Sequence, residues 1–340
     1  MRQDIRMEGV LHFPRQLAKV FLSAGSGFSL TSLAAALVIA AAIIAWRRMR
    51  RNRPLRAGTV LRGLFPRWLI RNDSTLADVG YFGFNVFVYG IIFGWAVLSY
   101  KLYSGFVADG LTAVFGAVAP TSWDLTARVI ITLALFLAYE FGYWVDHFLK
   151  HRVPALWELH KVHHSANVLT PLTVWRLHPL DGVIFSNIVA LSLGVTNGVA
   201  NYLFGKPVTF FSIGDTNIIL VVFVHIYVHL QHTHLWIAFT GLAGRVFLSP
   251  AHHQIHHSNN PVHFDKNLGS CLAIFDWLFG TLHMPAKEPE PLAFGVKVGE
   301  ADMHSFGELA VAPVQRAAAH VVQSWRGEPA AVADAPRGLS

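Results

Sequence analysis

The sequence has little charge and almost no cysteine. Of its 340 residues, 14% are charged and 53% are hydrophobic, whereas about 25% of the residues in an ordinary soluble domain are charged. These values argue against a water-soluble globule, and they exclude a disordered chain, which has few apolar residues and much charge. The single cysteine, Cys271, excludes an intramolecular disulfide framework and a cysteine-based zinc or iron–sulfur site.

What the sequence has instead is a series of apolar runs of membrane-spanning length. A helix that crosses a bilayer core takes about 20 apolar residues. Suitable runs lie near 25–46, 79–102, 129–145, 183–204 and 208–230. The last run carries Asp215 and Asn217, so it is expected either to span or to re-enter the membrane. We therefore predict an all-α integral membrane protein with four or five transmembrane or re-entrant helices.

The positive charges are clustered beside the first apolar run. Lys and Arg outnumber Asp and Glu by 27 to 20, and nine arginines lie in the loop 47–71. This position is typical of a juxtamembrane anchor rather than a nucleic-acid-binding face, so we expect no nucleic-acid partner. Segment 103–127 contains no Lys or Arg. The positive-inside rule then places 47–71 in the cytoplasm and 103–127 on the far side.

Nineteen histidines are the other unusual feature, and sixteen of them lie between His147 and His283. Four groups have the spacing of one helix face: His147 and His151; His160, His163 and His164; His225, His229 and His232; and His253, His256 and His257. Counting the apolar runs brings all four groups to the cytoplasmic side of the membrane. Imidazole is the commonest metal-ligand side chain, and one ion cannot take so many, so the pattern predicts two metal ions in a helical, histidine-rich cap.

The residues around these histidines are similar to the histidine boxes of the fatty acid hydroxylase (sterol desaturase) superfamily. The similar segments are 140–165, Ser-Pro-Ala-His-His-Gln-Ile-His-His-Ser at 249–258, Asp-Lys-Asn-Leu-Gly at 265–269 and Asp-Trp-Leu-Phe-Gly-Thr at 276–281. The resemblance extends from about 138 to 284. It implies a non-haem centre with two Fe that uses O2 and two electrons to hydroxylate or desaturate a lipid C–H bond. Sterol, hopanoid, carotenoid and fatty acyl substrates all fit the boxes.

The resemblance also assigns roles to individual residues. It implies that the metal ligands are His147, His151, His160, His163, His164, His232, His253, His256 and His257, with a tenth supplied by His229 or His225. Residues expected to contact these ligands or the substrate are Glu140, Arg176, His178, His234, Asn267 and Asp276. For Glu140, a hydrogen bond to a ligand imidazole and a plain interfacial carboxylate are equally good interpretations.

These patterns divide the chain into three parts. We predict an N-terminal membrane region over 1–128, a catalytic domain over 129–285, and a polar C-terminal segment over 286–340 with a surface helix near 303–325. A glycine-rich dinucleotide-binding unit, a haem-domain motif and a cysteine cluster are absent from the sequence, so a separate ferredoxin, cytochrome or reductase is expected to supply electrons. The expected location is a bacterial inner membrane, or the endoplasmic reticulum in a eukaryote.

Two other classes of protein compete with this interpretation. A membrane zinc hydrolase is expected to carry His-Glu-x-x-His, with the glutamate as the base, and that string does not occur in the sequence. A metal-binding or transport protein is expected to place polar ligands near the bilayer midplane, where only Asp215 and Asn217 are candidates.

Overall fold

The computed structural model describes residues 14–296 and 306–327, and this part of the chain is almost entirely helical. Its regular strands are β1 (Ser212–Ile213) and β2 (Thr216–Asn217), which pair as a small antiparallel hairpin. The predicted all-α class is therefore confirmed.

Four helical segments are long and apolar enough to cross a membrane, as predicted. They are α2 (Leu30–Arg50), the interrupted segment Tyr89–Phe115, α8 (Asp124–Arg152) and α10 (Pro179–Leu203). Helix α2 begins where the side chain of Ser29 accepts a hydrogen bond from the backbone of Ser32, and three arginines lie in its last turn. Positive charge at the carboxyl end of a helix is favourable because it faces the negative end of the helix dipole.

The predicted span over 79–102 is wrong in its bounds. Helix α5 (Asp73–Phe87) ends before the middle of that run, and the short α6 (Tyr89–Phe93) and η1 (Gly94–Ala96) follow. The backbone is extended at Val97 and at Ser99, whose side chain caps the next helix, α7 (Tyr100–Phe115). Both helices are apolar, so composition alone did not show the break between them. The first half of segment 103–127 is consequently helix rather than loop.

The run 208–230 does not form one continuous helix. Its first half is extended and contains the β1–β2 hairpin, and helix begins only at Ile218. It then continues through α11 (Ile218–Phe223), the π-helical turn η3 (Val224–Val228) and α12 (His229–Gln231). The side-chain amide of Asn217 donates to the backbone oxygen of Thr132 at 2.8 Å, which ties the hairpin to α8. This helix is shorter than the about 20 residues that a span takes.

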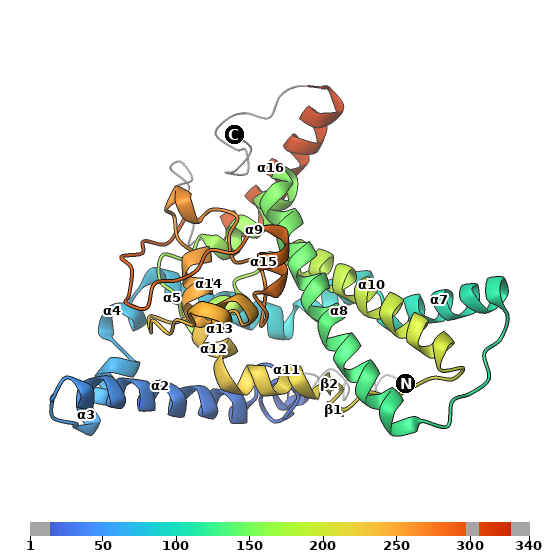
Figure 1. Ribbon diagram of the computed structural model, residues 1–340. Coiled ribbons are helices and arrows are strands. Elements are labelled where there is room, and N and C mark those ends of the chain that lie inside the picture. Colours follow the sequence, from blue (N-terminus) through green and yellow to red (C-terminus); the bar gives the residue numbers. More distant parts are fainter. Residues whose placement is uncertain (1–13, 297–305, 328–340) are drawn as a thin grey trace, which may run out of the picture.

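Three of the spanning helices, α7, α8 and α10, lie side by side (Figure 1). Helices α10 and α7 approach closely because two glycines face α7. A Cβ built on Gly194 lies 2.4 Å from the Cβ of Tyr103, and one built on Gly198 lies 2.7 Å from the backbone oxygen of Ser104. Small residues at such positions allow two helix backbones to pack directly.

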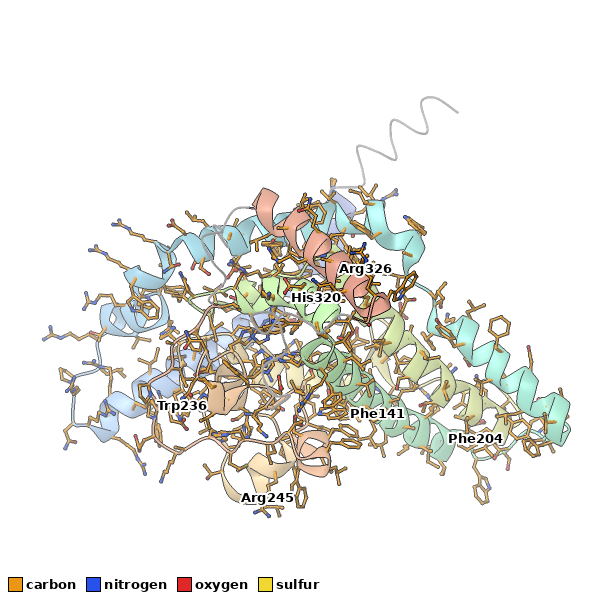
Figure 2. All side chains as sticks on the ribbon, turned by 90° about the horizontal axis from the view of Figure 1, so that it is seen from above. Phe141, Phe204, Trp236, Arg245, His320 and Arg326 are labelled. Atoms are coloured by element: carbon orange, nitrogen blue, oxygen red, sulfur yellow. The ribbon has the colours of Figure 1, made fainter. Side chains whose placement is uncertain are left out.

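A cap of short helices lies at the carboxyl end of α8 (Figure 1). Its elements are α9 (Pro154–His164), η2 (Pro171–Trp175), α13 (Gly241–Val246), α14 (Pro250–His256), η4 (Pro261–His263) and α15 (Ile274–Phe279). The short helices α3 (Ala57–Leu64) and α4 (Arg67–Ile70) follow α2. Figure 2 shows Phe204 at the end of α10 far from the cap.

The C-terminal helix α16 (Phe306–Trp325) packs along α9, and Figure 2 shows His320 on it above the cap. Buried Glu158 on α9 forms ion pairs with Lys161 and, at 2.5 Å, with Arg316 of α16. Leu309 packs against Val162 in the same interface. The described part of the C-terminal segment is therefore a partner of a histidine-bearing helix.

Candidate metal centre

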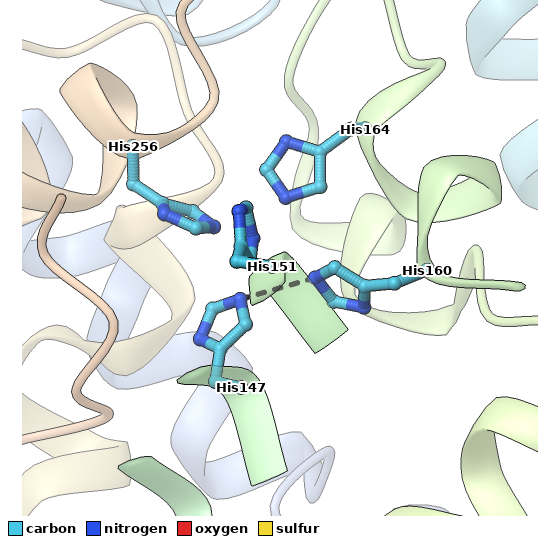
Figure 3. Close-up of side chains that lie close together, drawn as sticks. All are labelled: His147, His151, His160, His164 and His256. Carbon is cyan, nitrogen blue, oxygen red and sulfur yellow. Dashed lines mark hydrogen bonds between the residues drawn. The ribbon is translucent and has the colours of Figure 1, made fainter. Parts of the chain in front are cut away.

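Nine buried histidines converge in the cap as two groups. The five-histidine group contains His147, His151, His160, His164 and His256, and the four-histidine group contains His163, His232, His253 and His257. Within each group, one ring nitrogen of each residue lies within 4.8 Å of the others. All nine side chains are between 2% and 6% exposed. Figure 3 shows the rings of the five-histidine group pointing toward one another from α8, α9 and α14.

The local sequence explains how two short helices supply most of these rings. Pro154 and Pro250 stand at the first turns of α9 and α14, where the missing N–H of proline costs nothing. Each helix ends in a pair of adjacent histidines, and each pair contributes one ring to each group. The rings of His164 and His257 lie 4.6 Å apart, so the two groups are in contact.

Outward hydrogen bonds orient the rings of the five-histidine group. His147 Nδ1 donates to the oxygen of Leu268 (2.8 Å), His256 Nδ1 donates to the oxygen of Lys266 (2.9 Å), His160 Nδ1 donates to Asp181 Oδ2 (3.3 Å), and His151 Nδ1 lies 3.4 Å from Asp265 Oδ1. A carbonyl oxygen only accepts, so the proton on such a ring is on Nδ1. The lone pair on Nε2 then points into the group.

Ring nitrogens within each group lie close enough together to share one cation. His147 Nε2 and His160 Nε2 lie 3.1 Å apart, and both carry lone pairs because their protons are on Nδ1. In the four-histidine group, His232 Nε2 lies 2.9 to 3.3 Å from the Nε2 atoms of all three partners. One proton can serve only one of these pairs, whereas one metal ion attracts all the lone pairs of its group. The donor atoms therefore fit a metal ion in each group.

Burial favours the neutral form of these histidines, which is the form that binds metals. Burial, together with the neighbouring imidazoles, lowers the pKa of His163, His164 and His257 well below the usual range. Burial also lowers the pKa of His232 to about 3. A neutral imidazole releases no proton when it binds a metal, so binding at neutral pH meets little competition from protons.

Comparison with known proteins agrees with this geometry. Residues 132–281 match the fatty acid hydroxylase family. This match covers less than half of the chain, and it is to the family whose histidine boxes the sequence resembles. The matched region contains both histidine groups in full and the helices that present them. No solved structure matches the chain.

The relatives that the chain resembles are named for different lipids. An ornithine lipid hydroxylase from Rhizobium tropici is 29% identical over 169 residues, which cover 49% of this chain and 45% of that protein. An alkylglycerol monooxygenase from Danio rerio is 28% identical over 161 residues, 47% of this chain and 32% of that protein. A Delta(7)-sterol-C5(6)-desaturase from Nicotiana tabacum is 27% identical over 190 residues, 54% of this chain and 59% of that protein. The chain thus matches less than two thirds of the length of each.

His229, the predicted tenth ligand, is not brought into either group. Its Nε2 lies 3.0 Å from the hydroxyl of Ser32 on α2, and its ring contacts the edge of Phe28. The alternative, His225, contacts Thr31 on the same helix at 3.2 Å. Both face α2, whereas His232 follows the last helical residue with a non-helical backbone and joins the four-histidine group.

Asp276 and Asn267 lie in the segment after the third histidine box, and their side chains form hydrogen bonds with backbone groups near the histidines. Asp276 accepts hydrogen bonds from the backbone N–H groups of Leu268 and Gly269 at 2.8 and 2.9 Å, and the oxygen of Leu268 accepts from His147. Asn267 donates to the backbone oxygen of His252 at 3.0 Å. These two residues therefore hold the loop that orients ligand rings.

Glu140 does not serve a ligand imidazole. Its carboxylate accepts the backbone N–H groups of Cys271 and Leu272 at 2.9 and 2.8 Å. The hydrogen-bonding interpretation of Glu140 as a partner of a ligand ring is corrected by this geometry. The residue faces the 271–272 segment, which also packs on Phe136 of α8, and it fixes the loop to that helix.

Three more predicted residues lie around the centre rather than in it. Buried Arg176 donates to the backbone oxygen of Val162 at 3.2 Å and pairs with Asp78 at 3.2 Å, so it braces the end of α9. His178 caps α10 and donates to the backbone oxygen of Ala310 at 3.0 Å. His234 donates to the backbone oxygen of Gly63 at 2.8 Å.

No role was assigned from the sequence to two carboxylates that contact histidines of the five-histidine group. Asp181 and Asp265 face the outer nitrogens of ligand rings, and Lys150 pairs with Asp181 at 2.6 Å. Metal-binding histidines commonly donate a hydrogen bond to a carboxylate, so a carboxylate partner could be expected from the sequence. Which of the nearby carboxylates takes this position could not be predicted, because it depends on how distant segments fold together.

An apolar cavity lies beside α12, the helix that leads to His232. It has a volume of about 400 Å³ and is lined by α2, α3, α4, η2 and α12, including Phe28, Ala36, Leu69, Leu172, His229 and Thr233. Much of its wall comes from the N-terminal region, which precedes the part of the chain that matches the superfamily.

Proposed function

We propose that this protein is an O2-dependent enzyme with two iron ions that hydroxylates or desaturates a C–H bond of a membrane lipid. The observation that carries the proposal is the pair of buried all-histidine groups whose Nε2 lone pairs converge. The relatives are lipid hydroxylases, monooxygenases and desaturases, which supports lipid oxidation as the class of reaction.

In such a reaction, different residues of this chain bind the metals and orient the metal-binding rings. The nine imidazoles hold the metals through neutral nitrogen atoms, which suit iron as well as zinc and copper. Asp181, Asp265 and two carbonyl oxygens fix the rings from behind. Two bound iron ions with O2 supply the oxidising power to remove hydrogen from a C–H bond that has no useful acidity.

The apolar cavity supports a lipid as the substrate. Its wall combines α2 with α12, the helix that leads directly to His232. An alkyl chain in this cavity is out of contact with water and is directed along α12 toward the four-histidine group. The substrate enters from the bilayer in this proposal, because α2 is one of the candidate membrane spans.

A membrane zinc hydrolase is supported less well by the same geometry. Such an enzyme needs a carboxylate base that reaches the attacking water. The carboxylates described beside the groups, Asp181 and Asp265, instead face outer ring nitrogens. A transport protein is also disfavoured, because the groups lie in the cap and at the carboxyl end of α8 rather than midway along the candidate spans.

The test of the proposed function uses the full chain purified in lipid nanodiscs and loaded anaerobically with Fe(II). We expect two irons per chain, no haem absorption band, and a product that gains one atom from ¹⁸O2 or loses two hydrogens when a reductant is supplied. A lipid extract from a host that lacks the gene provides the substrate. Activity that persists without O2, or with zinc alone, contradicts the proposal.

We further propose that the cap faces the cytoplasm and that a separate ferredoxin, cytochrome or reductase docks there to deliver electrons. The basic loop 47–71 supports this orientation. Cysteines placed at exposed Ala117 and at exposed Glu288 should differ in labelling by an impermeant reagent in intact cells, and buried Cys271 stays unlabelled. Equal labelling of the two positions contradicts the orientation.

A further inference from the structure

A third group of potential metal ligands lies outside the two histidine groups. His263, His283 and Glu290 offer two ring nitrogens and one carboxylate oxygen within 4.8 Å of one another. The proposed reaction uses none of these residues. His263 ends η4, His283 follows α15, and Glu290 lies in the segment that continues along the cap.

Local hydrogen bonds hold Glu290 and His283 in place within this group. Glu290 Oε1 accepts the backbone N–H of Ala286 at 3.0 Å, and Glu290 Oε2 lies 3.9 Å from His263 Nε2. That distance is too long for a hydrogen bond. The backbone N–H of His283 donates to Asn267 at 2.8 Å, which fixes the position of the second ring.

His263 is a buried side chain that lacks a satisfactory partner. It is 5% exposed, its Nδ1 has no hydrogen-bond partner among the described residues, and its ring meets that of His283 edge to face with the centroids 4.9 Å apart. Unsatisfied buried polar groups in native proteins are rare and often mark a water or an ion. The nitrogen nearest Glu290 is the other one, Nε2, so the ring has one nitrogen for an ion there and one for a water molecule. Glu290 is 27% exposed, so an ion can reach the group from solvent.

We propose that His263, His283 and Glu290 form a separate zinc-binding site. Two imidazoles and one carboxylate are a donor set that zinc takes, usually with a water molecule as the fourth ligand. Donor atoms on a tetrahedral zinc lie about 3.3 Å apart. The 3.9 Å between His263 and Glu290 therefore needs to close by only about half an ångström. Burial lowers the pKa of His263, which favours its neutral, metal-binding form.

The position of the site gives it a structural role. The segment after Glu290 pairs with the chain beyond the third histidine box: Asn259 donates its backbone N–H to the oxygen of Ala293 at 2.9 Å. Asn267, which holds His283, also binds the oxygen of His252. Zinc here ties the end of η4 to the segment after α15, and none of its three donors belongs to the two histidine groups. This inference is independent of the proposed function.

The test is a zinc count on the full chain in nanodiscs, equilibrated by dialysis against submicromolar free zinc. Wild type is expected to hold one zinc more per chain than Glu290→Gln and than His283→Ala. Glu288→Gln, which changes an exposed carboxylate on the same segment, is the matched control and is expected to bind as wild type does. The difference is read against wild type under the same conditions, so it does not depend on which metal fills the histidine groups.

A second measurement separates zinc binding from loss of fold. Added zinc is expected to raise the melting temperature of wild type and of Glu288→Gln when the histidine groups are already loaded with iron, and to leave Glu290→Gln unchanged. Equal zinc counts in wild type, Glu290→Gln and His283→Ala overturn the proposal. So does an equal zinc-dependent rise in melting temperature for wild type and Glu290→Gln.

Discussion

The two histidine groups use the same kind of ligand but differ in what lies behind the rings. In the five-histidine group, two rings donate to backbone carbonyls and two face the carboxylates of Asp181 and Asp265. In the four-histidine group, the Nδ1 atoms of His253 and His257 have no hydrogen-bond partner among the described residues. A partner on the outer nitrogen fixes the ring and raises its basicity. We therefore expect the five-histidine group to bind its metal more tightly.

This difference shows that two features have separate origins in the sequence: the spacing of the histidines, and the groups that form hydrogen bonds with their outer nitrogens, which we call their support. The spacing is local, because α9 and α14 each present their histidines on one face. The support is not local, because the carboxylate of Asp181 and the carbonyl of Leu268 reach the rings from segments far along the chain. Changes to ligands and changes to their support should therefore have separable effects.

The largest effect is expected when each group loses one ligand. His256→Ala removes a ring from the five-histidine group and His257→Ala removes one from the four-histidine group. Both variants should fall to background activity, because the proposed reaction needs both metals, and each should lose metal from its own group. Metal analysis and turnover of the iron-loaded protein measure this. His320→Ala on α16 is the control, and full activity with both metals in His256→Ala contradicts the assignment.

A smaller effect is expected when a support is removed and its ligand is kept. Asp265→Asn weakens the partner of His151 and should lower activity or metal affinity by about 10- to 100-fold. Metal should leave the five-histidine group first in a chelator titration of this variant, which reverses the order expected for wild type. Asp124→Asn is a matched control, since Asp124 is exposed at the other end of α8. An unchanged order of release argues against the asymmetry between the groups.

The four-histidine group should also make the metal-free protein sensitive to acid. The pKa of His232 in the folded protein is about 3, below its usual value of 6.5. As the pH falls below 6.5, the unfolded chain takes up this proton before the folded chain does. The stabilising contribution is thus complete above about pH 6.5 and is lost as the pH falls toward 3. Thermal unfolding of metal-free protein should show this loss, and His232→Gln should reduce its dependence on pH.

The sequence predicted the site better than it predicted the membrane region. The nine converging histidines are the nine that the resemblance to the histidine boxes implied as ligands. Helix spacing alone did not select them, because His225 and His229 have similar spacing but face α2. The break at Ser99 could not be predicted, because the apolar residues on both sides of it look alike and only a capping serine marks the boundary. The partner of Glu140 was missed because backbone N–H groups at 271 and 272 have no signature in the sequence.

The smallest effect is expected at the edge of the four-histidine group. His229 precedes His232 by one turn, but it contacts Ser32 and lines the apolar cavity instead of joining the ligands. His229→Ala should therefore keep both metals and lose activity only several-fold, mainly through a higher KM for the lipid. Metal content and kinetics of the purified variant measure the two effects separately, with His225→Ala as the matched control on the same helix. Loss of one metal from His229→Ala would instead give the four-histidine group a fifth ligand and remove the difference in ligand number between the two groups.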